Sequence, residues 1–267
     1  MIKLIASDMD GTLLDDRKQL PADFFEIVDR LNEKGVRFTV ASGRTYAALV
    51  HLFPEEYHTK LDFICDNGAY IVHEGKAVDI TPLERSVFEE FIAAAEEIGG
   101  FRMLVCAVNG TYHLPCDPEF DKEVAKFYKN HIPVDDLLSI SDTIYKLAIC
   151  DMQGAKERGK PALDRIFGDR LNIQVSGPIW MDVMAGGVSK GTALAKLSGI
   201  LGIDKSEVMA FGDYYNDLDM LQNAGMSFAM ANGNEDIKAI CTHTADTNNN
   251  GGVTKAIKEY VLNEVVS

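Results

Sequence analysis

Hydrophobic and polar positions alternate along the chain in a pattern that predicts strands followed by helices. Residues 2–7 form a short apolar run that stops at Asp8, as expected of a buried parallel strand. Residues 21–34 carry apolar side chains at helical spacing and are followed by Gly35, and residues 36–41 form a second apolar run. This order is typical of a parallel sheet whose strands are joined by crossover helices.

The same alternation predicts further elements on both sides of the middle of the chain. Before it, we expect a helix from about residue 45, strands at 61–65 and 70–73, and a hairpin turn at Glu74-Gly75-Lys76. After it, we expect helices at 190–201, 216–224, 235–240 and 253–262, and strands at 208–211 and 226–230. The asparagine-rich residues 248–252 are expected to be a loop before the last helix.

The middle of the chain, residues 82–184, follows a different pattern. A Glu- and Ala-rich helix at 83–98 is followed by short strand-like runs, at 103–108, 112–114, 144–151 and 180–184. We therefore predict an α/β fold with a parallel-sheet core built from residues 1–81 and 185–267. Residues 82–184 are predicted to be an inserted α+β domain with a small sheet of its own.

Composition narrows the possible partners of this 267-residue chain. Acidic residues outnumber basic ones by 41 to 26, which gives a formal charge of −15. No basic run is present, so nucleic acid is not an expected partner. No window approaches eighteen uncharged apolar residues and the N-terminus predicts a strand, so we expect a soluble cytoplasmic protein without a membrane partner. The sequence does not predict an oligomeric state.

Cysteines and histidines are scattered along the chain. The five cysteines include no C-x-x-C pair, and Cys65 and Cys150 lie in strand-like runs, so buried thiols are expected. The six histidines show no H-x-x-x-H spacing. On spacing alone, neither a zinc site nor any metal role for histidine is expected.

The end of the first predicted strand carries the first candidate chemistry. Asp8 and Asp10 are two carboxylates spaced i, i+2, followed by Gly11 and Thr12. Ligands of open α/β sheets bind at the carboxyl ends of strands, so Asp8 is a candidate nucleophile and Asp10 a candidate proton donor. Two carboxylates facing a phosphate dianion repel unless a cation is present, and Mg²⁺ is the natural candidate. The alternative is that both aspartates only form a turn with Gly11.

Two further motifs offer groups that phosphoryl chemistry requires. Ser42, Gly43 and Arg44 follow the second strand and present a hydroxyl and, at Gly43, a backbone amide to phosphate oxygens. Lys190 lies at a helix start, an unfavourable place for a cation unless it pairs with Asp8 and a phosphate oxygen. The alternatives are an ordinary helix cap at Ser42 and a solvated surface lysine.

A second acidic cluster follows the predicted strand at 208–211. Asp213 can supply another oxygen to Mg²⁺, and Asn216 and Asp217 can orient phosphate, hold metal-bound water or hold Lys190. The same residues also suit a helix cap. Because all the motifs fall at strand ends compatible with one sheet edge, a shared site is the more economical interpretation.

These motifs resemble those of the haloacid dehalogenase superfamily of phosphatases, and within it the Cof-type, C2-capped hydrolases. The resemblance spans nearly the whole chain and is carried by Asp8-Met9-Asp10-Gly11-Thr12, Ser42, Asp66-Asn67-Gly68-Ala69, Lys190, Gly212-Asp213, Asn216-Asp217 and Ala229-Met230-Ala231-Asn232. It implies a Rossmann-like core, an inserted cap domain that sets substrate specificity, and Mg²⁺ held by Asp8, Asp213 and the backbone carbonyl of Asp10. The chain departs from the family pattern at Tyr214 and Gly233.

The expected activity is hydrolysis of a small phosphate monoester, such as a sugar phosphate, through an aspartyl-phosphate on Asp8. Asp10 is expected to act first as acid and then as base, while Lys190 offsets the charge on Asp8. Binding of the phosphoryl group is assigned to the amides after Asp8 and to side chains or amides on other loops, namely Met9, Ser42, Gly43, Lys190 and Asn216.

Supporting positions are assigned around these residues. Arg44 and Asn67 lie on the same predicted loops and are candidates for contact with substrate, although an ordinary loop contact fits each equally well. Thr12, Asp217 and Asn67 are expected to orient the groups that bind metal or phosphate. The insertion is expected to close over the site, to exclude water and to favour metabolites over protein substrates.

Three other functions compete with a phosphatase. A phosphomutase or phosphotransferase uses the same aspartyl-phosphate, with a substrate hydroxyl in place of water, and no residue excludes it. A signalling receiver module also combines a phosphorylated aspartate, Mg²⁺ and a lysine, but it needs neither the insertion nor a second acid at Asp10. A non-catalytic binding protein is disfavoured because every charged group that the chemistry needs is present.

Overall fold

The computed structural model describes residues 1–125, 128 and 131–264. It divides into two compact units, one made of Met1–Asp79 with Ser189–Ser267 and the other of Ile80–Val188. The sequence pattern predicts boundaries between residues 81 and 82 and between residues 184 and 185. No helix among the described residues is long and apolar enough to cross a membrane.

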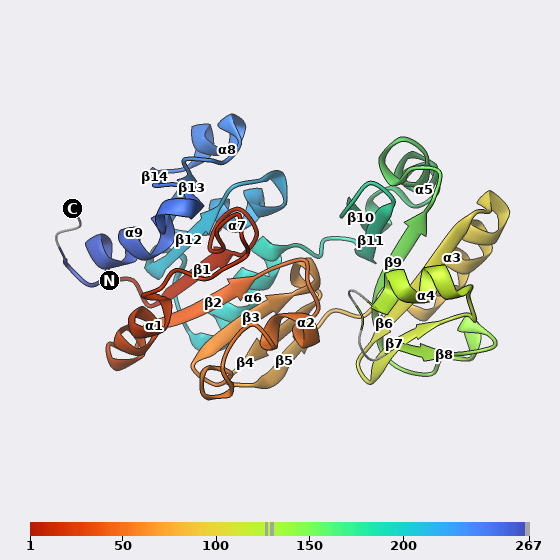
Figure 1. Ribbon diagram of the computed structural model, residues 1–267, viewed down its shortest axis with the longest axis horizontal. Helices are drawn as coiled ribbons and strands as arrows, with labels where there is room; N and C mark the ends of the chain where they lie inside the picture. The colour runs from red at the N-terminus through yellow and green to blue at the C-terminus, as the bar shows by residue number, and fades with distance from the viewer. Residues whose placement is uncertain (126–127, 129–130, 265–267) are drawn as a thin grey trace. The chain divides into compact units, whose positions relative to one another are not determined.

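The first unit is built on an eight-stranded sheet with β1 near its centre (Figure 1). The strands pair in parallel from β14 to β3, and β4 pairs antiparallel with β3. Their order across the sheet is β14 (His243–Ala245), β13 (Met226–Met230), β12 (Val208–Gly212), β1 (Leu4–Asp8), β2 (Arg37–Ala41), β3 (Leu61–Cys65), β4 (Tyr70–His73) and β5 (Lys76–Ile80). The predicted α/β fold with a parallel core is confirmed.

Helices cover both faces of this sheet, because the side chains of each strand alternate between the faces. Ile5 of β1 belongs to one hydrophobic cluster, which includes side chains of α1 (Phe24–Glu33), α2 (Tyr46–Val50) and α9 (Gly252–Tyr260). Leu4 and Ala6 belong to another, with side chains of α6 (Lys190–Leu201), α7 (Leu218–Gln222) and α8 (Glu235–Ile240). The strands are buried on both sides, which explains why residues 2–7 read as a continuous apolar run.

Strand order places the candidate residues at one sheet edge. From β1 the chain first adds β2 and β3 on one side, and later β12, β13 and β14 on the other. The carboxyl ends of parallel strands at such a switch point form the usual ligand crevice of open α/β sheets. Asp8 ends β1, Ser42 follows β2 and Asp213 follows β12.

The second unit has a six-stranded sheet with antiparallel pairing except between β7 and β8. The strand order is β10 (Leu171–Val175), β11 (Trp180–Ala185), β9 (Ile144–Asp151), β6 (Phe101–Ala107), β7 (Gly110–His113) and β8 (His131–Pro133). Side chains of α3 (Arg85–Ile98) and α5 (Lys160–Phe167) pack in one cluster with this sheet. Phe120 and Val124 of α4 (Pro118–Ala125) form another with Leu104, Ala148 and Cys150.

Several sequence predictions were wrong in detail. The helix expected at 216–224 is a 3-10 turn, Tyr215–Asp217, followed by α7, because the Asp217 carboxylate accepts hydrogen bonds from the Asp213 and Tyr214 amides. The loop expected at 248–252 contains a 3-10 turn, Asn248–Asn250, and the start of α9. Among the described α-helices and strands, those not anticipated are α4, α5, β8, β10 and β14. Two cysteines expected to be buried, Cys116 and Cys241, are partly exposed.

Candidate active site

Lys190 joins two carboxylates from remote parts of the first unit. Its ammonium donates to Asp8 Oδ1 at 2.5 Å and to Asp217 Oδ1 at 2.7 Å, and the side chain is buried. Lys190 occupies the first turn of α6, which Ser189 and Thr192 close with a reciprocal capping box. A cation is unfavourable at that end of a helix dipole, and the two carboxylates offset this cost.

Burial dominates the electrostatics of Asp8. Removal of the carboxylate from water, together with the charges of Asp217 and Asp213, raises the pKa of Asp8 to about 7 although Lys190 opposes this. Burial lowers the pKa of Lys190, but Asp217 and Asp8 outweigh it and raise that pKa above its usual value. Lys190 therefore remains protonated, and ionised Asp8 needs further positive charge.

Asp213 lies beside the loop that follows β1. Its Oδ1 accepts a hydrogen bond from the Thr12 hydroxyl at 2.9 Å. Gly11 has φ +92°, and a Cβ there would stand 2.5 Å from Asp213 Oδ2, so only glycine allows this approach. Burial, followed by the charge of Asp217, raises the pKa of Asp213. The loop thus holds a carboxylate that is destabilised in its ionised form.

The donor set fits a hard divalent cation. Carboxylate oxygens of Asp8, Asp213 and Asp217 lie within 4.8 Å of one another. Three carboxylates face one ammonium group, so the cluster carries excess negative charge, and oxygen-only donors are those that Mg²⁺ prefers. Both Asp217 oxygens already accept hydrogen bonds, from Lys190 and from the amides of Asp213 and Tyr214. Asp8 and Asp213 are therefore the side chains best placed to hold Mg²⁺.

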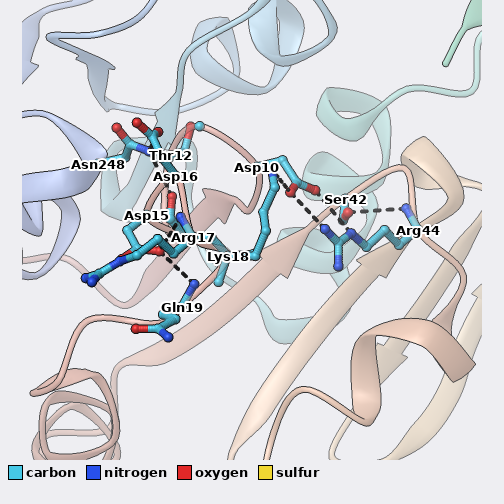
Figure 2. Close-up of polar contacts among 12 residues, drawn as sticks. Asp10, Thr12, Asp15, Asp16, Arg17, Lys18, Gln19, Ser42, Arg44 and Asn248 are labelled. Carbon is cyan, nitrogen blue, oxygen red and sulfur yellow. Dashed lines mark hydrogen bonds and ion pairs between the residues drawn. The ribbon is translucent and has the colours of Figure 1, made fainter. Parts of the chain in front are cut away.

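The Asp10 carboxylate is held by two cations (Figure 2). Arg44 donates to it through Nε at 3.1 Å and Nη2 at 2.8 Å, and Lys18 donates to Oδ1 at 2.8 Å. Burial raises the pKa of Asp10, but Lys18 and Arg44 together lower it below its usual value. Lys18 was missed by sequence reasoning, since a lone lysine in a polar loop has no distinguishing pattern.

Ser42, Gly43 and Asn67, three further candidate residues, lie together on neighbouring loops. The Ser42 Oγ accepts from the Arg44 amide at 3.2 Å, and the Ser42 carbonyl accepts from the Asn67 amide at 3.0 Å. A Cβ at Gly43 would lie 3.0 Å from Asn67 Nδ2. Asn67 has φ 52° and a buried Oδ1 without a hydrogen-bond partner among the described residues.

The two remaining predicted phosphate contacts lie on different parts of the loops. The Met9 side chain is fully buried in the hydrophobic cluster of Ile5, so only its backbone could serve the site. Asn216 is half-buried in the 3-10 turn after β12. Tyr214, where the chain departs from the family pattern, exposes 57% of its surface next to Asp213.

Two asparagines brace the loop after β1, a role that sequence reasoning assigned to neither of them. Asn232 donates to the Gly11 carbonyl at 2.7 Å and accepts from the Asn248 amide at 2.9 Å. Asn248 is buried and donates to the Leu14 carbonyl at 3.0 Å. The asparagine cluster read only as a loop, because sequence gives no sign that its side chains reach back to the first strand.

Known proteins resemble this chain over nearly its whole length. A family model described as haloacid dehalogenase-like hydrolase matches residues 5–257. The chain is 33% identical over 265 residues to the Escherichia coli 5-amino-6-(5-phospho-D-ribitylamino)uracil phosphatase YbjI, covering 98% of this chain and 97% of that protein. It is 30% identical over 244 residues to the HMP-PP phosphatase of Klebsiella pneumoniae, covering 91% and 89% respectively.

The fold is likewise similar to solved structures. SMU.1108c from Streptococcus mutans superposes with a TM-score of 0.84 at 28% identity, over 98% of this chain and all of that one (100%). The expected class of enzyme, a phosphatase of this superfamily, is confirmed. The chain belongs to the haloacid dehalogenase-like hydrolase family.

Proposed function

We propose that this enzyme hydrolyses small phosphate monoesters with the help of Mg²⁺ and through an aspartyl-phosphate formed on Asp8. The observation that carries the proposal is the buried Lys190, which joins Asp8 to Asp217 beside the Asp213 carboxylate. A lysine held in this way keeps Asp8 fixed and partly neutralised. A nucleophilic carboxylate that approaches a phosphate dianion needs both effects.

Asp8 and Asp213, with the backbone carbonyl of Asp10, would hold Mg²⁺. When bound, the ion would offset the negative charge of Asp8 and of the phosphate. Thr12 orients Asp213 through its hydroxyl, and Asp217 orients Lys190.

Two proton transfers accompany the proposed reaction. An Asp8 oxygen bonds to phosphorus as the ester P–O bond breaks, and Asp10 gives its proton to the departing alkoxide. Ionised Asp10 then takes a proton from water, whose oxygen bonds to phosphorus as the bond to Asp8 breaks. Inorganic phosphate leaves, and Asp8 is restored as a carboxylate.

The remaining site residues are proposed to bind the phosphoryl group. Ser42 offers its hydroxyl, Gly43 and Met9 offer backbone amides, and Asn216 offers its side-chain amide. Arg44 and Asn67 are proposed to contact substrate, and the second unit is proposed to select it. For Arg44, contact with substrate requires that its guanidinium give up one or both of its hydrogen bonds to Asp10.

The proposed substrate class is a phosphorylated sugar or sugar alcohol. Support comes from the relative at 33% identity, which is named for a phosphoribitylamino substrate. That compound, 5-amino-6-(5-phospho-D-ribitylamino)uracil, is therefore the first to test, with HMP-PP and common sugar phosphates beside it.

The test is release of inorganic phosphate by the purified full chain. We expect Mg²⁺-dependent turnover that is lost with a chelator, recovered with Mg²⁺ and abolished in Asp8→Asn. Asp29→Asn serves as the matched control, because it removes a carboxylate of α1 that pairs with Lys60 and is not among the candidate site residues. This variant should retain turnover. Near-normal rates in Asp8→Asn would contradict the proposal. Conversion of a sugar phosphate into an isomer without phosphate release would instead identify a mutase.

A further inference from the structure

The second unit brings together three potential metal ligands, which match no metal-binding spacing in the sequence. His113 ends β7, Cys116 lies in the following loop and Asp121 lies in α4. Cys116 Sγ lies 3.7 Å from His113 Nδ1 and donates to Asp121 Oδ1 at 2.8 Å. One ligand atom from each residue lies within 4.8 Å of the others. We infer that His113, Cys116 and Asp121 form a binding site for Zn²⁺ or a similar borderline-soft divalent cation.

The distances suit a tetrahedral zinc shell. Bonds from zinc to sulfur, nitrogen and oxygen of about 2.0–2.3 Å place neighbouring ligand atoms about 3.6 Å apart. The distance from Cys116 Sγ to His113 Nδ1 already matches this value. Cys116 Sγ and Asp121 Oδ1 are closer because they share the thiol proton, and replacing that proton by a metal would move them apart by about 0.8 Å.

His131 completes the surroundings of His113. Its Nδ1 lies 2.9 Å from His113 Nε2, and the strands that carry the two histidines, β7 and β8, pair in parallel. A histidine that binds metal through one ring nitrogen normally donates its other N–H to a nearby acceptor, which fixes the ring. His131 Nδ1 can accept that proton, so His131 is a positioning residue in the proposed site.

Metal binding here exchanges one set of hydrogen bonds for another. Without metal, the Leu114 carbonyl lies 2.8 Å from His113 Nδ1 and can accept its proton. With metal on Nδ1, that proton is lost and Nε2 carries the ring proton instead, donated toward His131. Burial and the Asp121 hydrogen bond raise the pKa of the Cys116 thiol to about 11, so the sulfur enters the complex by releasing a proton to solvent.

The donor chemistry separates this site from the carboxylate cluster of the first unit. Sulfur and imidazole nitrogen favour Zn²⁺ over Mg²⁺, whereas oxygen-only donors favour Mg²⁺. Three protein ligands leave a fourth position for water. The bound ion would also tie α4 to β7, beside the small hydrophobic cluster that contains Phe120 and Val124.

The test uses the full chain with Co²⁺ as a spectroscopic probe, in excess Mg²⁺. We expect a thiolate-to-cobalt charge-transfer band, because the carboxylate site contains no sulfur and cannot produce one. Zn²⁺ should displace the Co²⁺ and remove the band. Cys116→Ser should lack the band, whereas Cys241→Ser, which removes the other partly exposed thiol, should retain it.

The His131 variants test the positioning role separately. His131→Ala should weaken Zn²⁺ binding, measured by competition with Co²⁺, by about 10–100-fold. His131→Asn, whose side-chain oxygen can accept the His113 proton, should recover part of that loss. Circular dichroism checks the fold of each variant, and Cys116→Ala replaces Cys116→Ser if the latter does not fold. Absence of the band in the wild type, or its persistence in the ligand variant, would overturn the inference.

Discussion

Arg44 and Asp10 form a two-point ion pair, with Arg44 Nε 3.1 Å from Asp10 Oδ2 and Nη2 2.8 Å from Oδ1. Lys18 adds a third contact to the same carboxylate. Bidentate pairing of this kind is stronger and more directional than a single contact. These cations favour the ionised form of Asp10, so its proposed role as proton donor requires that they loosen their hold when substrate binds, and they set the pH range in which Asp10 can act.

Lys18→Ala tests this control directly. Loss of Lys18 should raise the pKa of Asp10, since the lysine is one of the groups that lower it. Leaving-group protonation needs protonated Asp10, so the basic limb of kcat/KM for an alkyl phosphate should move to higher pH. Lys60→Ala, which removes a partly exposed lysine paired with Asp29, should leave the pH of the basic limb unchanged. An unchanged pH profile of kcat/KM in Lys18→Ala would show that Lys18 does not set the pKa of Asp10.

Asp10→Asn distinguishes the acid role from a general loss of function. An alkyl phosphate has a poor leaving group and should lose about 10²–10⁴-fold in kcat/KM. p-Nitrophenyl phosphate should lose much less, because a stable leaving group needs little protonation. Steady-state kinetics with both esters provides the comparison. Equal losses would argue that Asp10 does not protonate the leaving group.

Asp8→Asn should stabilise the metal-free protein at neutral and higher pH. Because burial raises the pKa of Asp8 from 3.8 to about 7, the native state binds more protons than the unfolded state between these values. The free energy of unfolding therefore falls as pH rises through this window, by at most about 4 kcal/mol from this group.

Denaturant unfolding with a chelator, at pH 4 and pH 8, measures the effect. The advantage of Asp8→Asn over the wild type should be larger at pH 8, since Asp8 is protonated and neutral at the lower pH. Mg²⁺ should reduce the advantage, because it binds the wild-type native state. A difference independent of pH would show that burial does not destabilise ionised Asp8.

Gly11→Ala and Gly35→Ala form a matched pair. Both positions have positive φ, +92° and +70°, so each substitution should cost about 1–2 kcal/mol of stability. Only at Gly11 would the new Cβ meet Asp213, whereas a Cβ at Gly35 would meet no atom within 4 Å beyond its chain neighbours. Denaturation should show a loss of stability in both variants, larger in Gly11→Ala because its Cβ also meets Asp213, but only Gly11→Ala should weaken Mg²⁺ activation. Similar Mg²⁺ dependence of turnover in the two variants would show that the Gly11 loop does not help to form the metal site.

The parallel core could be predicted from sequence because its determinants are local and repeated. Residues 61–65, 190–201 and 226–230 were predicted with the observed bounds, since each is a clear apolar run or a capped helix. The short elements of the second unit were missed because little local signal marks them. For example, β8 has three residues and ends in Pro133.

For the site, sequence located residues but not their mutual contacts. The convergence of Asp8 and Asp213 followed from the carboxyl ends of parallel strands sharing one edge, and the pairing of Lys190 with Asp8 followed from its unfavourable place at a helix start. The pairing of Arg44 with Asp10 did not follow, since a basic and an acidic side chain on adjacent loops can each face solvent. His113 and Cys116 were likewise interpreted as unrelated residues, because three-dimensional proximity decides ligation and their spacing matches no common zinc motif.

The central place of β1 in its sheet also constrains how the chain is made. One neighbour, β2, follows closely in sequence, but the other is β12, Val208–Gly212. During synthesis from the N-terminus, the first strand therefore keeps an open hydrogen-bonding edge until most of the polypeptide has emerged from the ribosome. Nascent chains halted before residue 208 should present that edge, with Asp8 at its end, to chaperones or to other chains.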